Sequence, residues 1–306
     1  MLSVDHLPRP AQPSGPATAP AGTPPVTPSE PRVEGHVTGP DQARTTAGLE
    51  SRQSALEQVG IASGWHVLDA GCGSGDFLPW LAELVGPQGS VSAVDRVAEN
   101  TVRAAAHMRQ HAPGHAVDVR RADVLDLPHA DDSFDAVWCA DVLQHLDDGQ
   151  LTRALRELSR VVRPGGLVAV QVPDAASVTV RPGDPFVFLD FLRAAAPSCA
   201  YARQLLRGRD LHRWLRETGL ASVHQHTTVI EHLAPLEPAA LRFWTRICSR
   251  LARQARGTGG GWDHRWAPFA DADAADHPLR SRHGYVSEGT TLAIGTVPRA
   301  ADVRLT

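Results

Sequence analysis

The chain has 306 residues and a mass of 32.8 kDa, which is enough for one large domain or two smaller ones. Its formal net charge of −4 at pH 7 gives no basic footprint for nucleic acid. No run approaches the ~20 apolar residues of a membrane span, and no basic-then-apolar leader opens the sequence. We therefore expect a cytoplasmic protein, monomer or homodimer, without nucleic-acid or membrane partners.

All 30 basic residues are Arg, and Ala, Gly and Pro are abundant, which is typical of a high-GC genome such as an actinobacterial one. The four cysteines are scattered without the spacing of a metal site or a redox pair. The sequence therefore predicts a reduced protein without a bound metal.

Residues 1–40 are rich in Pro, Ala, Gly, Ser and Thr and have no hydrophobic period, so we predict that they are disordered. The alternative is a lid, or an arm exchanged between partners. Residues 41–306 are predicted to form a single domain. Its first element is a helix over 42–60, placed where it could cap a pocket beside the first strand.

After that helix, β and α periods alternate with short turns, which favours a Rossmann-like, doubly wound, mostly parallel sheet of seven strands. We predict strands over 65–70, 90–95, 116–120, 134–138, 167–172, 220–232 and 288–297. Helices are expected over 77–81, 98–110, 150–162, 201–218 and 238–255.

Two stretches, at about 173–200 and 233–286, interrupt the alternation and carry most of the remaining aromatic residues. The first is expected to hold an inserted helix. The second contains the helix over 238–255, a Gly-rich break and an aromatic loop. Loops above the strand ends carry specificity on a fixed scaffold, so we expect these insertions to form a cap over the substrate.

The centre of the pattern is the stretch His66 to Phe77, in which an apolar run ends in Asp69 and glycines follow at alternate positions. A strand, a tight turn and a helix N-terminus are indicated, and the backbone amides of such a turn can hold a ligand. On its own this Gly-x-Gly-x-Gly is a weak signal.

Five short sequence motifs, which follow one another along the chain, strengthen the signal of the glycine loop. They are Val67–Gly75, Val94-Asp95, Ala122–Pro128, Phe134–Val137 and Glu157–Gly166. Together they resemble the class I S-adenosylmethionine-dependent methyltransferases, in particular the small-molecule branch of ubiquinone and menaquinone biosynthesis. The resemblance covers residues 60–175 well and the rest only as topology.

The resemblance implies S-adenosylmethionine as cofactor and gives its site residues. Asp69 would face the ammonium and sulfonium region, Asp95 the ribose hydroxyls, and Asp123 with the Val124 amide the adenine. The backbone near Cys139 and the side chain of Gln144 would approach the methionine moiety. The full set expected at the cofactor is Asp69, Gly71, Cys72, Gly73, Gly75, Asp95, Arg96, Asp123, Val124, Cys139 and Gln144.

A nicotinamide or flavin oxidoreductase is the competing class, and a non-catalytic cofactor-binding protein is a third. A pyrophosphate site requires Gly-x-Gly-x-x-Gly, whereas position 76 is Asp and Asp69 precedes the loop. Two acids would then face a doubly charged pyrophosphate, so a sulfonium ligand suits the loop better.

For the acceptor, His145 is the candidate general base, since histidine titrates near neutral pH, although it could equally hydrogen-bond a neighbouring loop. We expect an aromatic or polycyclic secondary metabolite, with an acceptor in quinone or other primary metabolism as the alternative. The expected acceptor contacts are Phe186, Phe188, Phe191, Tyr201, Trp244, Trp262, His264 and Trp266. Their alternative role is to form the core of the insertions themselves.

Overall fold

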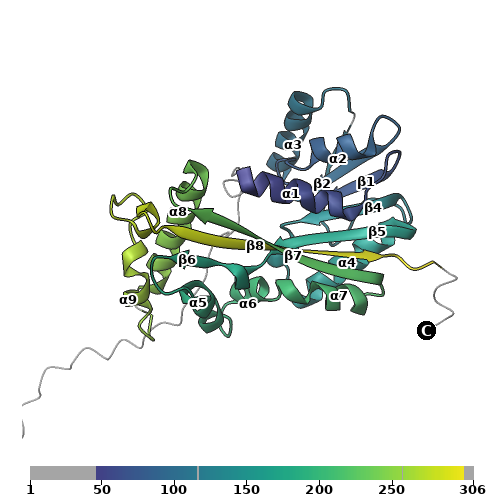
Figure 1. Ribbon diagram of the computed structural model, residues 1–306. Helices are drawn as coiled ribbons and strands as arrows, with labels where there is room; N and C mark the ends of the chain where they lie inside the picture. The colour runs from purple at the N-terminus through teal and green to yellow at the C-terminus, as the bar shows by residue number, and fades with distance from the viewer. Residues whose placement is uncertain (1–45, 116, 257, 300–306) are drawn as a thin grey trace, which may run out of the picture.

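The computed structural model describes residues 46–115, 117–256 and 258–299 (Figure 1). The predicted disordered segment over 1–40 lies outside these residues. Within them, no helix is both long enough and apolar enough to cross a membrane.

One eight-stranded sheet runs through the molecule in the order β3-β2-β1-β4-β5-β8-β6, with β7 paired to the other edge of β8. The first five strands are parallel, and β8 is antiparallel to its neighbours. Their bounds are β1 His66–Ala70, β2 Ser90–Asp95, β3 Val117–Arg121, β4 Phe134–Ala140, β5 Val162–Pro173, β6 Thr179–Arg181, β7 Ala221–Leu233 and β8 Tyr285–Thr296. The predicted Rossmann-like fold is confirmed, and the additional strand is β6, too short to show a periodic pattern.

Helices cover both faces of the sheet. On one face, α1 (Thr46–Val59), α2 (Leu78–Val85) and α3 (Ala98–His111) pack with the inward side chains of β1 and β4. On the other face lie α4 (Asp148–Val161) and α7 (Leu211–Glu217). We call the face of the sheet that α1, α2 and α3 cover the α1 face.

The helix predicted over 201–218 is wrong as a single element. It is divided into α6 (Ala200–Leu206) and α7, with the 3-10 turn Gly208–Asp210 between them. Gly208 passes so close to the end of β5 that an added Cβ would lie 2.9 Å from the Pro173 carbonyl oxygen. The chain must bend at that point to follow the sheet, and a contact of this kind leaves no periodic signal.

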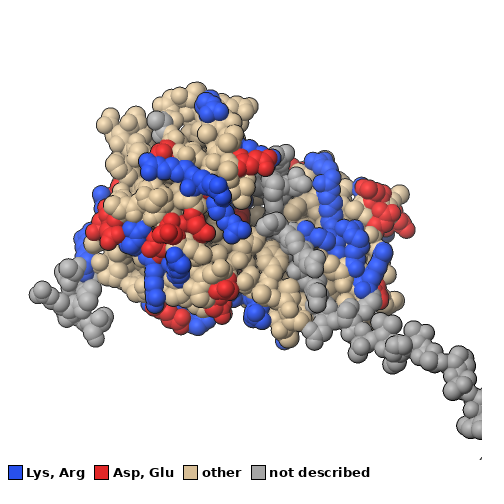
Figure 2. Space-filling view, turned by 180° about the vertical axis from the view of Figure 1, so that it is seen from behind, with Lys and Arg blue, Asp and Glu red and all other residues tan. Residues whose placement is uncertain are grey.

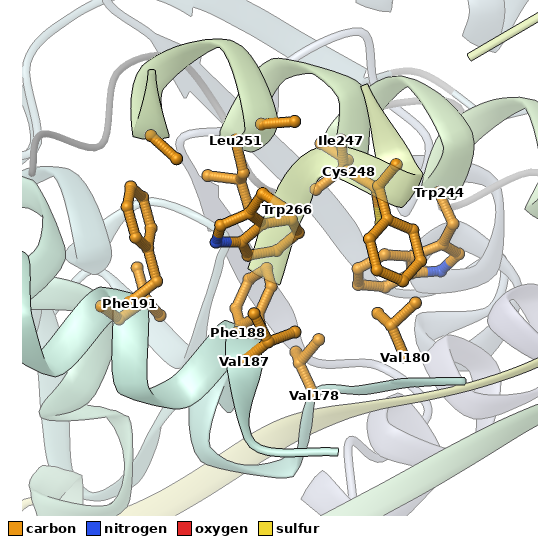
Figure 3. Close-up of a cluster of buried hydrophobic side chains, with 14 of the residues drawn as sticks. Val178, Val180, Val187, Phe188, Phe191, Trp244, Ile247, Cys248, Leu251 and Trp266 are labelled. Carbon is orange, nitrogen blue, oxygen red and sulfur yellow. The ribbon is translucent and has the colours of Figure 1, made fainter. Parts of the chain in front are cut away.

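The two insertions pack against each other into a second hydrophobic core, which we call the cap. It contains α5 (Val187–Ala195), α6, α8 (Pro238–Ala255) and α9 (Trp262–Trp266), the last within the stretch expected to be a loop. Figure 3 shows the side chains of α5, α8 and α9 interleaved with Val178 and Val180 from the segment that leads through β6.

Strand β8 joins the two regions, because it runs from the parallel sheet out beneath the cap, with β7 alongside it (Figure 1). Its residues Leu292 and Ile294 belong to the core under α1, whereas Val286 belongs to the core of the cap. One continuous strand therefore fixes the cap relative to the carboxyl edge of the parallel sheet.

Candidate cofactor and acceptor site

The three glycines of the β1–α2 loop are needed for different reasons. All have positive φ, at 89° for Gly71, 54° for Gly73 and 87° for Gly75. An added Cβ on Gly71 would lie 2.2 Å from Cγ2 of Val142, and one on Gly75 would lie 2.9 Å from Cα of Ala104. On Gly73 it would meet no atom of the described chain within 4 Å. Two glycines therefore pack the loop, and the third leaves a backbone surface that a ligand can approach.

Asp69 lies one residue before the end of β1 in a fully buried position, and its Oδ2 has no hydrogen-bond partner among the described residues. Burial, followed by the charges of Asp95 and Asp76, raises the pKa of its carboxyl to about 8. A buried acid without a donor is costly unless a ligand satisfies it. A cation or N–H donor at this point would both pair with the carboxylate and favour its ionised form.

Asp95, at the end of β2, links that strand to the glycine loop. Its Oδ2 accepts from the Gly73 amide at 3.0 Å, and its Oδ1 accepts from the Val97 amide at 2.8 Å and from Asn100 at 3.1 Å. The carboxylate is thus held rigidly, with lone pairs left on Oδ2 for a ribose hydroxyl. The adjacent Arg96 side chain is exposed.

The predicted adenine contacts lie beyond β3, in the turn that begins at Asp123. Oδ1 of Asp123 accepts from the Leu125 amide at 3.0 Å, and the side chain is exposed. Val124 is buried in the core between the sheet and α4. The turn thus has one polar and one apolar surface, which is what a planar heterocycle requires.

The residues expected near the methionine moiety are buried at the ends of β1 and β4. Gln144, in the 3-10 turn Leu143–His145 after β4, is 2% exposed, and both its amide atoms lack partners within the described residues. Cys139 and Cys72 are buried, and burial raises the pKa of both thiols, so they are neutral fillers. Gln144 is the member of this set with unmet hydrogen-bonding capacity.

Arg52 on α1 was not predicted as a site residue. Its Nη2 donates to Oδ2 of Asp141 at 2.8 Å, its Nη1 lies 3.9 Å from Oδ2 of Asp76, and its guanidinium lies over the ring of Phe77. Asp141 follows β4 with a φ of 58°, in the left-handed region. Arg52 therefore fixes α1 over the glycine loop, as expected for a helix that caps the cofactor pocket. Arginine on a half-polar helix carries no sequence signal of such a role.

His145 is exposed at the same edge of the sheet, and its ring stacks on Tyr201 of the cap. The two ring centroids are 5.7 Å apart with an angle of 3° between the planes. The structure thus brings together the predicted base and one predicted acceptor contact, at the boundary between the parallel sheet and the cap.

The other predicted acceptor contacts lie elsewhere. Phe188, Phe191, Trp244, Trp262 and Trp266 are buried in the cap, mostly edge to face with one another. Phe186 is 63% exposed and His264 is also exposed, outside that core. This placement supports the alternative interpretation, in which the rings form the core of the insertions.

Comparison with known proteins agrees with this geometry. Residues 67–166 match a family model described as a methyltransferase domain. Curated relatives include the methyltransferase GfsG of Streptomyces halstedii, 34% identical over 44% of this chain and 45% of that protein. Demethylmenaquinone methyltransferase of Listeria monocytogenes is 28% identical over 55% of this chain and 67% of the relative.

Among solved structures, a protein of Bacillus halodurans described as a methyltransferase superposes with a TM-score of 0.55. It is 18% identical, and the match covers 81% of this chain and all of that one, so the likeness concerns the fold.

The fold and the matched region point to one class: residues 67–166 are similar to methyltransferase domains. The chain spans about half the length of the first curated relatives that it matches. Its predicted cofactor residues from Asp69 to Gln144 all fall within the matched region.

Proposed function

We propose that the protein transfers a methyl group from S-adenosylmethionine to a small organic acceptor of secondary metabolism, aromatic or polycyclic in its framework. The observation that carries this proposal is the buried carboxyl of Asp69, whose Oδ2 has no hydrogen-bond partner among the described residues. An acid in that position suits a cationic amino-acid ligand and repels a pyrophosphate.

When bound, S-adenosylmethionine supplies an activated methyl group on a sulfonium. The residues of this chain then have to bind, align and exclude water. Gly73, which has no side chain and whose amide donates to Asp95, leaves room for the amino-acid part, Asp95 holds the ribose, and Arg52 keeps α1 over the pocket. Alignment of this kind contributes on the order of 7–11 kcal/mol to a bimolecular transfer.

His145 is the proposed base for an acceptor whose nucleophile carries a proton. Its stacking on Tyr201 fixes the plane of the imidazole, so its ring nitrogens point along a defined direction at the edge of the sheet. With the ring held in this way, His145 can take a proton from a hydroxyl or an ammonium group during transfer.

Two observations support secondary metabolism as the setting. Curated relatives at 34% identity come from Streptomyces, whereas the menaquinone enzymes of Listeria are 28% identical. The cap built from the two insertions gives the acceptor site its own walls, and we propose that it serves as the substrate cap of one catalytic domain. An acceptor in quinone metabolism is the second candidate, and the similarity to demethylmenaquinone methyltransferases supports it.

The test is incubation of the protein with deuteromethyl-labelled S-adenosylmethionine and an extract of aromatic natural products, read by mass spectrometry. We expect labelled product, and none from a Gly73→Val variant that retains its fold. Tight binding of NAD without binding of S-adenosylhomocysteine would contradict the proposal and favour an oxidoreductase.

A further inference from the structure

A band of polar side chains crosses the α1 face of the sheet between the two hydrophobic cores. Along β8, Ile294 and Leu292 lie in the core under α1, and Val286 lies in the core of the cap. Between Leu292 and Val286, the two residues of β8 whose side chains share this face are Thr290 and Glu288. Apolar residues would join the two cores without interruption, so the polar pair needs another explanation.

Neighbouring strands continue this band. On β7, His232 shares the face, and its Nε2 lies 2.7 Å from Oε1 of Glu288, with both side chains buried. On β5, Gln171 pairs with Leu292 and is 3% exposed, and its Oε1 has no hydrogen-bond partner among the residues described. We call Gln171, Thr290, Glu288 and His232 the polar band.

The polar band begins at the cofactor site. Gln171 pairs with Ala140 at the end of β4, and its carbonyl oxygen accepts from the amide of Asp141 at 3.0 Å. Asp141 is the partner of Arg52, which closes the cofactor pocket. From there the band runs along β8 towards the cap, on the same face as Asp69 and Trp138.

Burying such groups costs stability. A buried His–Glu pair and an unsatisfied amide oxygen are each less stable than apolar side chains of the same volume. A few convergent polar groups between apolar walls are instead the usual composition of a ligand site. The free Oε1 of Gln171 is an acceptor, so the matching ligand group has to be a donor.

We propose that the polar band is the floor of the acceptor site and selects acceptors with a hydroxyl or amino group on an otherwise apolar framework. Gln171 accepts a hydrogen bond from that group, and Glu288, positioned by His232, is placed farther along β8 to accept one from a second donor of the acceptor. This inference rests on the proposed function, since it places the acceptor beside the cofactor pocket.

The test uses protein saturated with S-adenosylhomocysteine and a matched pair of probes, a naphthol and naphthalene, with affinities measured by ligand-observed NMR. We expect the wild type to bind the naphthol at least tenfold more tightly than naphthalene. Gln171→Leu should remove most of that preference and leave the affinity for S-adenosylhomocysteine within twofold. Gln171→Leu keeps the volume and removes an unsatisfied oxygen, so its melting temperature should not fall.

Thr291→Val is the matched control, because this buried residue of β8 pairs with Thr227 on the opposite face of the sheet. It should keep the naphthol preference. Equal binding of the two probes by the wild type, no binding of either, or a preference unchanged in Gln171→Leu would overturn the inference. Failure of the wild type to bind S-adenosylhomocysteine would instead overturn the proposed function.

Discussion

The cofactor end of the sheet and the cap differ in the kind of side chain that fills them. At the cofactor end, buried polar groups such as Asp69 and Gln144 lack partners among the described residues. In the cap, seven buried aromatic rings pack mostly edge to face around α8. Polar groups left unsatisfied in a core lower its stability, whereas close aromatic packing raises it. The comparison indicates that the first region is arranged for a ligand and the second for holding the walls in place.

Charged side chains are arranged differently on the outer surface and around the glycine loop. Figure 2, which views the molecule from behind Figure 1, shows acidic and basic side chains interspersed over one face without a single dominant sign. Around the glycine loop, Arg52 lies against Asp76 and Asp141, and the carboxyls of Asp69 and Asp95 add to this acidic group. Such a site favours a ligand that carries positive charge.

The largest expected effect is on the stability of the cap. Trp266→Ala removes a fully buried ring and should lower the free energy of unfolding by about 3–5 kcal/mol. The affinity for S-adenosylhomocysteine, measured by calorimetry below the unfolding transition, should change less than twofold. A large loss of affinity in the folded variant would mean that the cap core contributes directly to the cofactor site.

For Asp69→Asn we expect the opposite pattern, a loss of cofactor affinity without a loss of stability. This change removes the carboxylate that faces the cation and should weaken cofactor binding by roughly tenfold or more. The melting temperature at pH 9 should rise, because the buried charge is lost. Leu68→Ala, at the neighbouring buried position of β1, serves as the control: it should lower stability with little effect on affinity. A lower melting temperature in Asp69→Asn would contradict a role in ligand binding.

The pH dependence follows from the raised pKa of Asp69. The native state holds this proton up to about pH 8, whereas the unfolded chain loses it near 3.8. Stability from this group is therefore present below pH 3.8 and is lost as pH rises to 8. Cofactor affinity should rise over pH 6 to 8, because ligand binding favours the ionised carboxylate. Calorimetric titrations across this range should show the rise in the wild type and not in Asp69→Asn.

A smaller effect is expected for the contact that holds α1. Arg52→Gln leaves Asp141 without its cation and should weaken S-adenosylhomocysteine binding by about fivefold. Arg103→Gln, in an exposed pair with Glu99, is the control and should have no effect. Equal affinities of the wild type and Arg52→Gln would remove α1 from the cofactor site.

The smallest effect is expected for Phe186→Ala, since this ring is 63% exposed. Its free energy of unfolding should change by less than about 0.5 kcal/mol in urea titrations. An unchanged acceptor KM would exclude this residue from the acceptor site, and a raised one would restore it as a contact.

The contrast between the regions also explains what the sequence could predict. The glycine loop, Asp95 and Gln144 lie in short local motifs, and the resemblance of these motifs to a known family is what implied a cofactor site there. Arg52 meets Asp141 across 89 positions, and Glu288 meets His232 across 56. Such pairs depend on strand register, which no local pattern specifies. The aromatic residues of the insertions were visible, but ring content alone could not distinguish a pocket wall from a packed core.

The most direct test of the account is a calorimetric titration of the wild-type protein with S-adenosylhomocysteine and, separately, with NAD. The account predicts saturable binding of S-adenosylhomocysteine and no detectable heat with NAD. Saturable binding of NAD without binding of S-adenosylhomocysteine would contradict it, because the acids around the glycine loop would then be facing a pyrophosphate.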